Sequence, residues 1–364
     1  MCSQSLTKCL YLNRFSSLGL TTSIMVGCAI ATAPPATAAS LGKILTATGQ
    51  VSIKRGGWTD YQPAAVGTSL DNGDLIWPAA GSQVKLQCSN GTQQPVTSGS
   101  PSGVANICPP PTSPDNDGTR GSDTIAGIDA NIPYLISPRR THLLSPTPTI
   151  RWNAVAGANS YRVRVRGVGV DWKTEVPTNQ VVYSGETPLQ PGKYYLITVV
   201  TDTDADSLSD PGMQLGFTML DDSQRANLQA DLTELSQQQL GQPAQTLAQA
   251  ILYQNYELRA EAIETLETAI SANIKSAQIY HTLAGLYEEV RLTQLAINNY
   301  LQAFQLASDS SDLVIKTEAA AKLAEIYSAL KDTAQAQRFL QEAIQGYETL
   351  GDVTRVQELQ KLQP

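Results

Sequence analysis

The stretch AQIYHTLAGLYEEVRLTQLAINNYLQAFQLAS, residues 277–308, decides the fold of the C-terminal part of this chain. Small and apolar residues recur in it three and four positions apart, namely Tyr280, Leu283, Ala284 and Tyr287 in the first half and Ala296, Tyr300 and Ala303 in the second. That spacing places each group on one face of a helix. The stretch is therefore predicted to form two helices joined by a turn, which approach each other at their small residues.

The pattern occurs again on both sides of this stretch. Its earlier copy is carried by Ala250, Tyr253, Ala262, Leu266 and Ala269, and its later copy by Leu323, Ala324, Tyr327, Ala336, Leu340 and Ala343. The order of aromatic, Leu, small residue and Tyr, followed by Ala, aromatic and Ala, resembles the tetratricopeptide repeat. Three repeats are the usual minimum for a stacked core of this kind. Helices over Gln224–Gln239 and Gln345–Leu362 are predicted to open and close the array.

The resemblance also implies a binding face, because the first helix of each tetratricopeptide pair lines a concave groove. The residues that would line it are Gln254, Asn255, Gln278, His281, Glu288, Glu289, Glu318 and Glu325, and we call them the predicted groove residues. Their polar and acidic character favours a protein or peptide partner that is neutral or basic. The competing interpretation is a solvated face without a ligand, in an array that uses its convex side or its edges.

The sequence favours a protein without catalytic activity. It contains 2 histidines and none of the metalloprotease, nucleophile-elbow, phosphate-loop or dinucleotide motifs. Glu288 and Glu289 are adjacent on a helix, so they point in different directions, unlike the paired carboxylates of a glycosidase. We predict no cofactor and no metal site. The formal net charge of -8 argues against nucleic acid as a partner.

The N-terminus has the composition of an export signal. Lys8 and Arg14 precede the uncharged apolar segment FSSLGLTTSIMVGCAIATA, residues 15–33, and small residues follow at Ala36 and Ala38. Residues 1–38 are therefore predicted to be a signal peptide that directs the chain to the periplasm or cell envelope, or to the thylakoid lumen in a photosynthetic source. A competing interpretation is that MVGC, residues 25–28, resembles a bacterial lipobox, which would place a lipid anchor on Cys28.

Cysteine usage agrees with export. Of the 5 cysteines, Cys88 and Cys108 are the two that lie beyond the predicted signal. In an oxidising compartment they are predicted to form a disulfide closing a loop of about 20 residues, which contributes about 3 kcal/mol. The alternatives are two free thiols or a zinc site, and the latter would need histidines that the neighbouring sequence does not supply.

Residues 39–90 alternate polar and apolar side chains as half-buried strands do, for example at Val84, Leu86 and Cys88. Glycines and Asn-Gly pairs at 56–57, 72–73 and 90–91 indicate turns. The spacing of GQVSIKRGG, GTSLDNGDLIW and SQVKLQCSNG resembles the FecR-type domain, a small β-rich bacterial periplasmic module. Residues 91–138, rich in Pro, Gly and Ser, are predicted to be a linker tethered by the disulfide.

Residues 139–220 are predicted to form a second β module. The segment LQPGKYYLITVVT, residues 189–201, places Tyr195 just after a Pro-Gly turn. This spacing resembles fibronectin type III and immunoglobulin-like sandwiches, in which that tyrosine hydrogen-bonds back to the chain. Three arginines share the outer face of one strand, Arg162, Arg164 and Arg166. We interpret them as a solvated face, with an anion-binding stripe as the alternative.

Together these patterns predict a multidomain β + α protein: a small FecR-like β domain, an immunoglobulin-like β-sandwich, and a C-terminal all-α tetratricopeptide repeat solenoid over residues 221–364. The predicted function is that of an extracytoplasmic scaffold that binds a protein or peptide partner through the helical array. The rival hypothesis is a cell-envelope protein that binds glycan or senses it through the two β modules.

Overall fold

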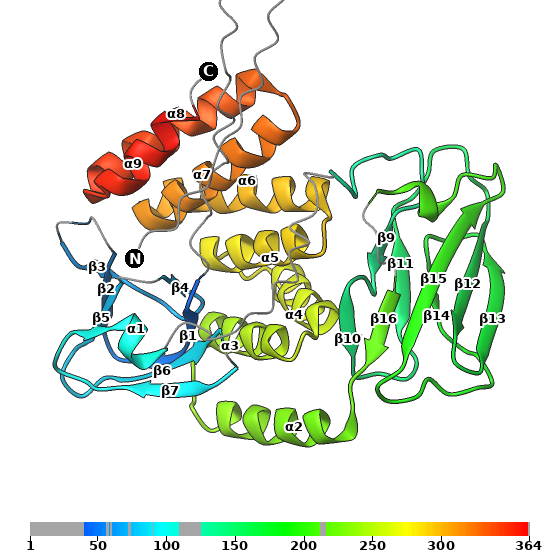
Figure 1. The fold of residues 1–364 in the computed structure, drawn as a ribbon, viewed down its shortest axis with the longest axis horizontal. Coiled ribbons are helices and arrows are strands. Elements are labelled where there is room, and N and C mark those ends of the chain that lie inside the picture. Colours follow the sequence, from blue (N-terminus) through cyan, green and yellow to red (C-terminus); the bar gives the residue numbers. More distant parts are fainter. Residues whose placement is uncertain are drawn as a thin grey trace, which may run out of the picture. The chain divides into compact units, whose positions relative to one another are not determined.

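The computed structural model describes residues 40–362 apart from 56–57, 59, 72–73, 90, 109–124 and 212–215. The predicted signal peptide, Cys28 and the predicted turn residues 56–57, 72–73 and 90 lie outside the described residues. In the described part of the chain, β-sheet modules precede eight helices, as the sequence predicted (Figure 1). None of the helices in these ranges combines the length and the apolar character needed to cross a membrane.

The N-terminal β module, residues 40–108, consists of two four-stranded sheets with the strand orders β4-β1-β6-β7 and β3-β2-β5-β8. Its elements are β1 (Gly42–Thr48), β2 (Val51–Lys54), β3 (Gln62–Pro63), β4 (Ser69–Leu70), β5 (Leu75–Pro78), β6 (Gln83–Cys88), β7 (Gln93–Val96), β8 (Ser102–Gly103) and α1 (Val104–Ile107). Val84, Leu86 and Cys88 are buried on β6 as predicted, but Gln87 between the last two is buried as well, so the alternation ends at Leu86.

This module extends beyond the predicted boundary at residue 90. β7 pairs with β6 and β8 pairs with β5, so residues expected in the linker complete both sheets. The predicted disulfide between Cys88 and Cys108 joins the end of α1 to β6. The sequence did not predict these strands because their composition is polar. An edge strand needs little apolar surface, and on β7 only Val96 is buried.

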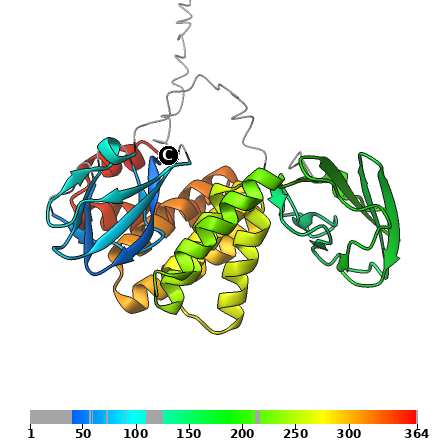
Figure 2. The same ribbon diagram turned by 90° about the horizontal axis from the view of Figure 1, so that it is seen from below.

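The second β module is a sandwich whose sheets have the orders β10-β16-β15-β12-β13 and β14-β11-β9; Figure 2 shows it in green. Its elements are β9 (Leu135–Ser137), β10 (Thr141–Leu143), β11 (Thr149–Trp152), β12 (Tyr161–Gly167), β13 (Val170–Val176), β14 (Gln180–Val182), β15 (Tyr194–Thr201), the 3-10 turn η1 (Ser207–Ser209) and β16 (Gly216–Met219). Trp152, Tyr183, Tyr195 and Phe217 fill its core, each at most 2% exposed. The sandwich begins before the predicted boundary at residue 139, because β9 pairs with β11.

The helices contain the three predicted pairs, α3 with α4, α5 with α6 and α7 with α8, and neighbours in this series lie side by side (Figure 2). Their bounds are α2 (Asp222–Ser236), α3 (Gln242–Asn255), α4 (Arg259–Ser271), α5 (Ala277–Glu289), α6 (Thr293–Ser310), α7 (Leu313–Ala329), α8 (Thr333–Leu350) and α9 (Val353–Gln360). The small residues of the repeat pattern are buried as predicted, with Ala284, Ala296 and Ala303 at 0% exposure.

The three pairs also share one turn geometry. The left-handed residues of the turns are Glu257, Arg291 and Lys331, with φ of 58°, 57° and 61°. In each turn the next N–H donates to the carbonyl of the last tyrosine of the first helix, Tyr253, Tyr287 or Tyr327, at 2.9, 2.8 and 3.0 Å. The repeats therefore agree in backbone geometry as well as in sequence.

The C-terminal end of the array differs from the single closing helix predicted over Gln345–Leu362. Gly351, with φ of 74°, ends α8 in the left-handed conformation that glycine adopts without steric cost. The side chain of Asp352 then accepts the N–H of Arg355 and caps α9. Two local signals, a C-terminal glycine and an N-terminal aspartate, thus divide the predicted helix in two.

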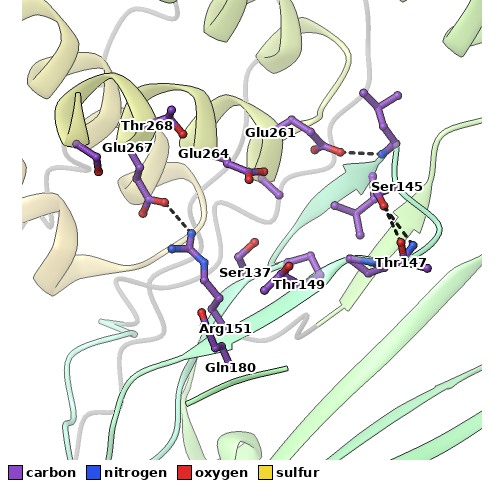
Figure 3. Close-up of a pocket in the computed structure, with 16 residues that line it drawn as sticks. Ser137, Ser145, Thr147, Thr149, Arg151, Gln180, Glu261, Glu264, Glu267 and Thr268 are labelled. Carbon is purple, nitrogen blue, oxygen red and sulfur yellow. Dashed lines mark hydrogen bonds and ion pairs between the residues drawn. The ribbon is translucent and has the colours of Figure 1, made fainter. Parts of the chain in front are cut away.

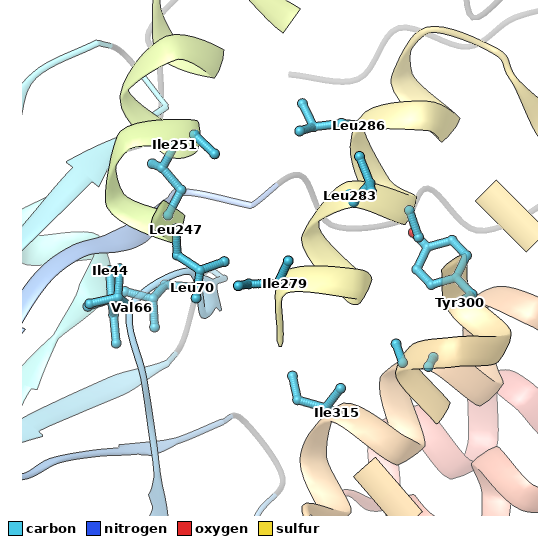
Figure 4. Packing of buried hydrophobic residues seen from close by; sticks show 14 of the residues in the cluster. Ile44, Val66, Leu70, Leu247, Ile251, Ile279, Leu283, Leu286, Tyr300 and Ile315 are labelled. Atoms are coloured by element: carbon cyan, nitrogen blue, oxygen red, sulfur yellow. The ribbon is translucent and has the colours of Figure 1, made fainter. Parts of the chain in front are cut away.

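The N-terminal β module and the helical array share one apolar core. Ile44 and Leu70 of the module pack towards Leu247 of α3 and Ile279 of α5, and all four are at most 3% exposed (Figure 4). Complete burial of an aliphatic side chain of this size contributes roughly 1.5–3 kcal/mol. The first helices of the repeats therefore have a partner within the same chain.

Candidate functional site

Most predicted groove residues lie where α3, α5 and α7 meet the N-terminal β module. Gln278 contacts the backbone of that module so closely that a Cβ added to Gly67 would lie 3.4 Å from its Cγ. Gly67 itself has φ of 94°, a conformation that favours glycine. The bare backbone at this position lets the module approach α5.

One ion pair across this interface joins Arg55 to Glu318 of α7. Their charged atoms are 2.5 Å apart, and the side chains are only 10% and 17% exposed. The guanidinium also lies over the ring of Trp58, whose indole N–H donates to Asp352 at 3.0 Å. Burial alone would lower the pKa of Arg55, but the carboxylates of Glu318 and Asp74 outweigh burial and raise it.

A second cation of the β module reaches α3. The ammonium of Lys43 donates to the side-chain carbonyl of Gln254 at 2.7 Å, and the amide of Gln254 in turn donates to Glu289. Arg259 pairs with the same Glu289 at 3.3 Å. Burial lowers the pKa of Lys43, and the charge of Glu289 partly opposes that effect.

His281 is packed within this interface. Its Nε2 lies 3.9 Å from Glu318, and its ring meets Tyr300 edge-on with the centroids 5.4 Å apart. Burial lowers the pKa of His281, which favours the neutral imidazole. The hydroxyl of Tyr300 donates to Glu288 at 2.8 Å. These contacts give the histidine a packing role in the array.

Lys322 connects the remaining carboxylates, because it lies 3.2 Å from Glu288 and 3.3 Å from Glu325. Asn255 is exposed at the end of α3. The predicted groove residues thus come together, with Asn255 at their margin, and the protein surface against them belongs to the same chain. The prediction that an outside partner binds there stays a prediction. Sequence reasoning missed Lys43, Arg55 and Lys322, since isolated cations on a strand or helix carry no signal of their partners.

Two of the three arginines on the outer face of β12 already have acidic partners. Arg162 pairs with Asp204 at 2.7 Å and Arg164 with Asp171 at 2.6 Å. These pairs agree with the interpretation of a solvated sheet face. For the alternative of an anion-binding stripe, two of the three arginines are thus already neutralised by aspartates of the same chain.

A pocket of about 650 Å³ lies between α4 and the strands β10 and β11 of the sandwich (Figure 3). Three glutamates of α4 project from one wall, Glu261, Glu264 and Glu267. The opposite wall carries Arg151 and a set of neutral hydroxyl and amide groups. These groups belong to Ser137, Ser145, Thr147, Thr149 and Gln180. The three glutamates recur at helical spacing, so one face of α4 presents them together.

The three glutamates differ in their partners. Glu267 is neutralised, since Arg151 donates to it at 2.8 Å and Tyr287 at 2.5 Å. One oxygen of Glu261 accepts the N–H of Leu144 at 2.7 Å, whereas its Oε2 is buried and has no hydrogen-bond partner among the described residues. Burial raises the pKa of Glu261 to about 7. Glu264 is exposed at the pocket. The pocket therefore has spare acceptor capacity and negative charge.

No family model and no curated protein matches this chain. Among solved structures, BtubC (BKLC) from P. vanneervenii is similar over 38% of this chain and 72% of its own, at 17% identity and a TM-score of 0.29. The MamA protein is similar over 38% and 76%, at 20% identity and a TM-score of 0.24. The FN1–FN3 domains of chicken CNTN1 cover 46% and 50%, at 15% identity and a TM-score of 0.17. Similarity at this level carries no argument about function.

Proposed function

We propose that this chain is an exported, non-enzymatic scaffold that binds a protein or peptide partner through its tetratricopeptide-like array. The first-helix face of the array holds the chain's own N-terminal β module, and helix α4 supplies the wall that receives the partner. The observation that carries the proposal is the unpartnered, buried Oε2 of Glu261 in a pocket of about 650 Å³. Pockets of roughly 300–1,000 Å³ are typical of ligand sites in proteins.

The charges of the pocket define the chemistry of the partner. Because Arg151 neutralises Glu267, the carboxylates left for a ligand are Glu261 and Glu264. A lysine or arginine side chain of the partner would pair with them, and charge-assisted hydrogen bonds of this kind are the stronger ones. The hydroxyls of the opposite wall would bond the partner's backbone. This chemistry is that of the neutral or basic partner expected from the sequence.

Two further observations support the proposal. His281 and Glu288 are engaged in packing and ion pairs within the array, which leaves neither poised as a general acid or base. The disulfide between Cys88 and Cys108 is of the kind that persists in oxidising compartments, which supports export.

The test is site-specific photocrosslinking with the full chain in its native envelope. A photoreactive residue replaces Thr147, which is exposed and lines the pocket, and a matched chain carries it at Lys193, exposed elsewhere on the sandwich. We expect one defined protein to crosslink from position 147 alone, and Glu264→Lys to abolish that product. Crosslinking of the same proteins from both positions, or of none from position 147, would overturn the proposal.

A further inference from the structure

A second pocket, of about 440 Å³, lies where β10 and β16 of the sandwich meet the start of α4 and the end of α5. Its lining includes Arg140, His142, Tyr194 and Thr218, residue types whose side chains are able to donate hydrogen bonds. Arg259 and Glu289 close it on the side of the helices. The pocket is separate from the one lined by Glu261, since the two share no residue.

Arg140 is held in this pocket at a conformational cost. Its φ is 49°, in the left-handed region that few residues other than glycine occupy. Two hydrogen bonds fix this backbone: its N–H donates to Gly216 at 3.1 Å, and its carbonyl accepts from Arg259 at 3.1 Å. Such strain persists where the surroundings over-determine it, and it concentrates at functional sites.

The charged residues that act on Arg140 are themselves arginines, namely Arg139, Arg259 and Arg291. Arg139 is compensated by Asp210 at 2.7 Å, and Arg259 by Glu289 at 3.3 Å. By contrast, the structure gives the guanidinium of Arg140 no carboxylate partner among the described residues. Burial lowers the pKa of Arg140, and the charges of Arg291, Arg259 and Arg139 lower it further.

The position of the Tyr194 side chain, which also lines this pocket, depends on a glycine. A Cβ added to Gly216 would collide with the hydroxyl of Tyr194. The hydroxyl can therefore occupy its position only because residue 216 has no side chain. The Nδ1 atom of His142 is buried and has no hydrogen-bond partner among the residues described. The pocket therefore combines an uncompensated cation with polar groups that have unused hydrogen-bonding capacity.

We propose that this pocket binds a carboxylate, which the guanidinium of Arg140 holds through two parallel N–H groups. The planar guanidinium matches the two oxygens of a carboxylate in geometry. Glu257 and Glu289, which also line the pocket, both pair with Arg259, so the net charge left for a ligand is small. A singly charged carboxylate fits that balance better than doubly charged phosphate.

Isothermal titration of the full chain at constant ionic strength tests this proposal with four probes. They are N-acetyl-trialanine with a free C-terminus, its C-terminal amide, sodium glucuronate and inorganic phosphate. We expect binding of the two carboxylates, none of the amide, and weaker binding of phosphate. The tighter of the two carboxylates identifies the source, a peptide terminus or an acidic sugar.

Variants of the full chain connect the binding to Arg140. Arg140→Gln is expected to weaken carboxylate binding by about tenfold or more, since charge-assisted hydrogen bonds are lost. Arg140→Lys keeps the charge without the planar fork and should bind with intermediate affinity, which also covers the case in which the glutamine variant fails to fold. Arg166→Gln, on an exposed arginine of β12, is the matched control and should bind as the wild type does. Equal affinity for the acid and its amide, no binding of either carboxylate, tighter binding of phosphate, or unchanged affinity in both Arg140 variants would overturn the proposal.

Discussion

The guanidinium of Arg55 lies 2.5 Å from the carboxylate of Glu318, which joins the N-terminal β module to helix α7 through a pair that is largely withdrawn from solvent. Removing one member of a buried pair leaves an uncompensated charge and typically costs 3–5 kcal/mol. We expect Arg55→Met to lower the free energy of unfolding by about that amount. Chemical denaturation monitored by circular dichroism measures the change.

Two matched variants sharpen this experiment. The double variant Arg55→Met with Glu318→Met removes both charges and should recover most of the lost stability, since an apolar replacement of a buried pair is often neutral. Arg162→Met breaks an exposed pair with Asp204 and should cost less than about 1 kcal/mol. If Arg55→Met costs no more than Arg162→Met, the pair does not hold the module to the array.

Tyr195 forms the predicted corner contact of the sandwich. Its ring is 0% exposed, and its hydroxyl accepts the N–H of Gln190 at 2.8 Å. Tyr195→Phe keeps the ring but leaves that N–H without its acceptor, so we expect a loss of about 1–3 kcal/mol in the free energy of unfolding. The neighbouring Tyr194 is 50% exposed, and Tyr194→Phe is expected to change stability by less than about 0.5 kcal/mol. Equal effects of the two variants would contradict a stabilising role for the corner.

The helices and the two β modules could be predicted from the sequence because their signals are local. The tetratricopeptide pattern places small residues at fixed helical positions, and Ala284 and Ala296 are buried where it requires. The alternation of Val84 and Leu86 indicates a strand for the same reason. The strand β7 was missed because its polar composition gives no strand signal. It is a strand because it pairs with β6, and that pairing is not visible in its own sequence.

The surface that covers the predicted groove could not be predicted in the same way. Ile44 and Leu70 have the pattern of ordinary core residues, and nothing in the sequence says that α3 and α5 lie against them. The acidic groove residues suggested a basic ligand. The structure places the cations Lys43 and Arg55 of the same chain beside them, a long-range pairing that composition and periodicity do not encode.

The partly buried His281 makes the free energy of unfolding depend on pH. Burial lowers the pKa of His281 in the folded chain, and the nearby cations Lys322, Lys43 and Arg55 act in the same direction against Glu318. The unfolded chain therefore takes up this proton at a higher pH than the folded chain does. The stability linked to His281 is fully present above about pH 6.5 and is lost as the pH falls below that value.

His281→Gln removes this titration. We expect the free energy of unfolding of the wild type to fall more steeply between pH 7 and pH 5 than that of the variant, because only the wild type must exclude the proton. Denaturation curves at half-unit pH intervals give both slopes. Parallel curves for the two chains would mean that the imidazole protonates in the folded state without cost.

Glu261 has the opposite linkage. Burial raises its pKa to about 7 in the folded chain, above the ordinary value of 4.5. The folded state thus retains a proton that the unfolded state releases, and the associated stability is present below about pH 4.5 and is lost as the pH rises through 7. Glu261→Gln keeps the acceptor for the N–H of Leu144 and cannot ionise. Relative to the wild type, the variant should gain about 2–3 kcal/mol between pH 4.5 and pH 8.

The exposed Glu264 provides the control for this variant, because it lines the same pocket but remains solvated. Glu264→Gln should shift stability by less than about 0.5 kcal/mol over the same pH range. If Glu261→Gln and Glu264→Gln show the same pH profile, the Glu261 carboxyl is not desolvated by the pocket.

A basic peptide that occupies the pocket should lower the pKa of Glu261. The affinity of the chain for such a peptide should therefore rise between pH 6 and pH 8 in the wild type and stay level in Glu261→Gln.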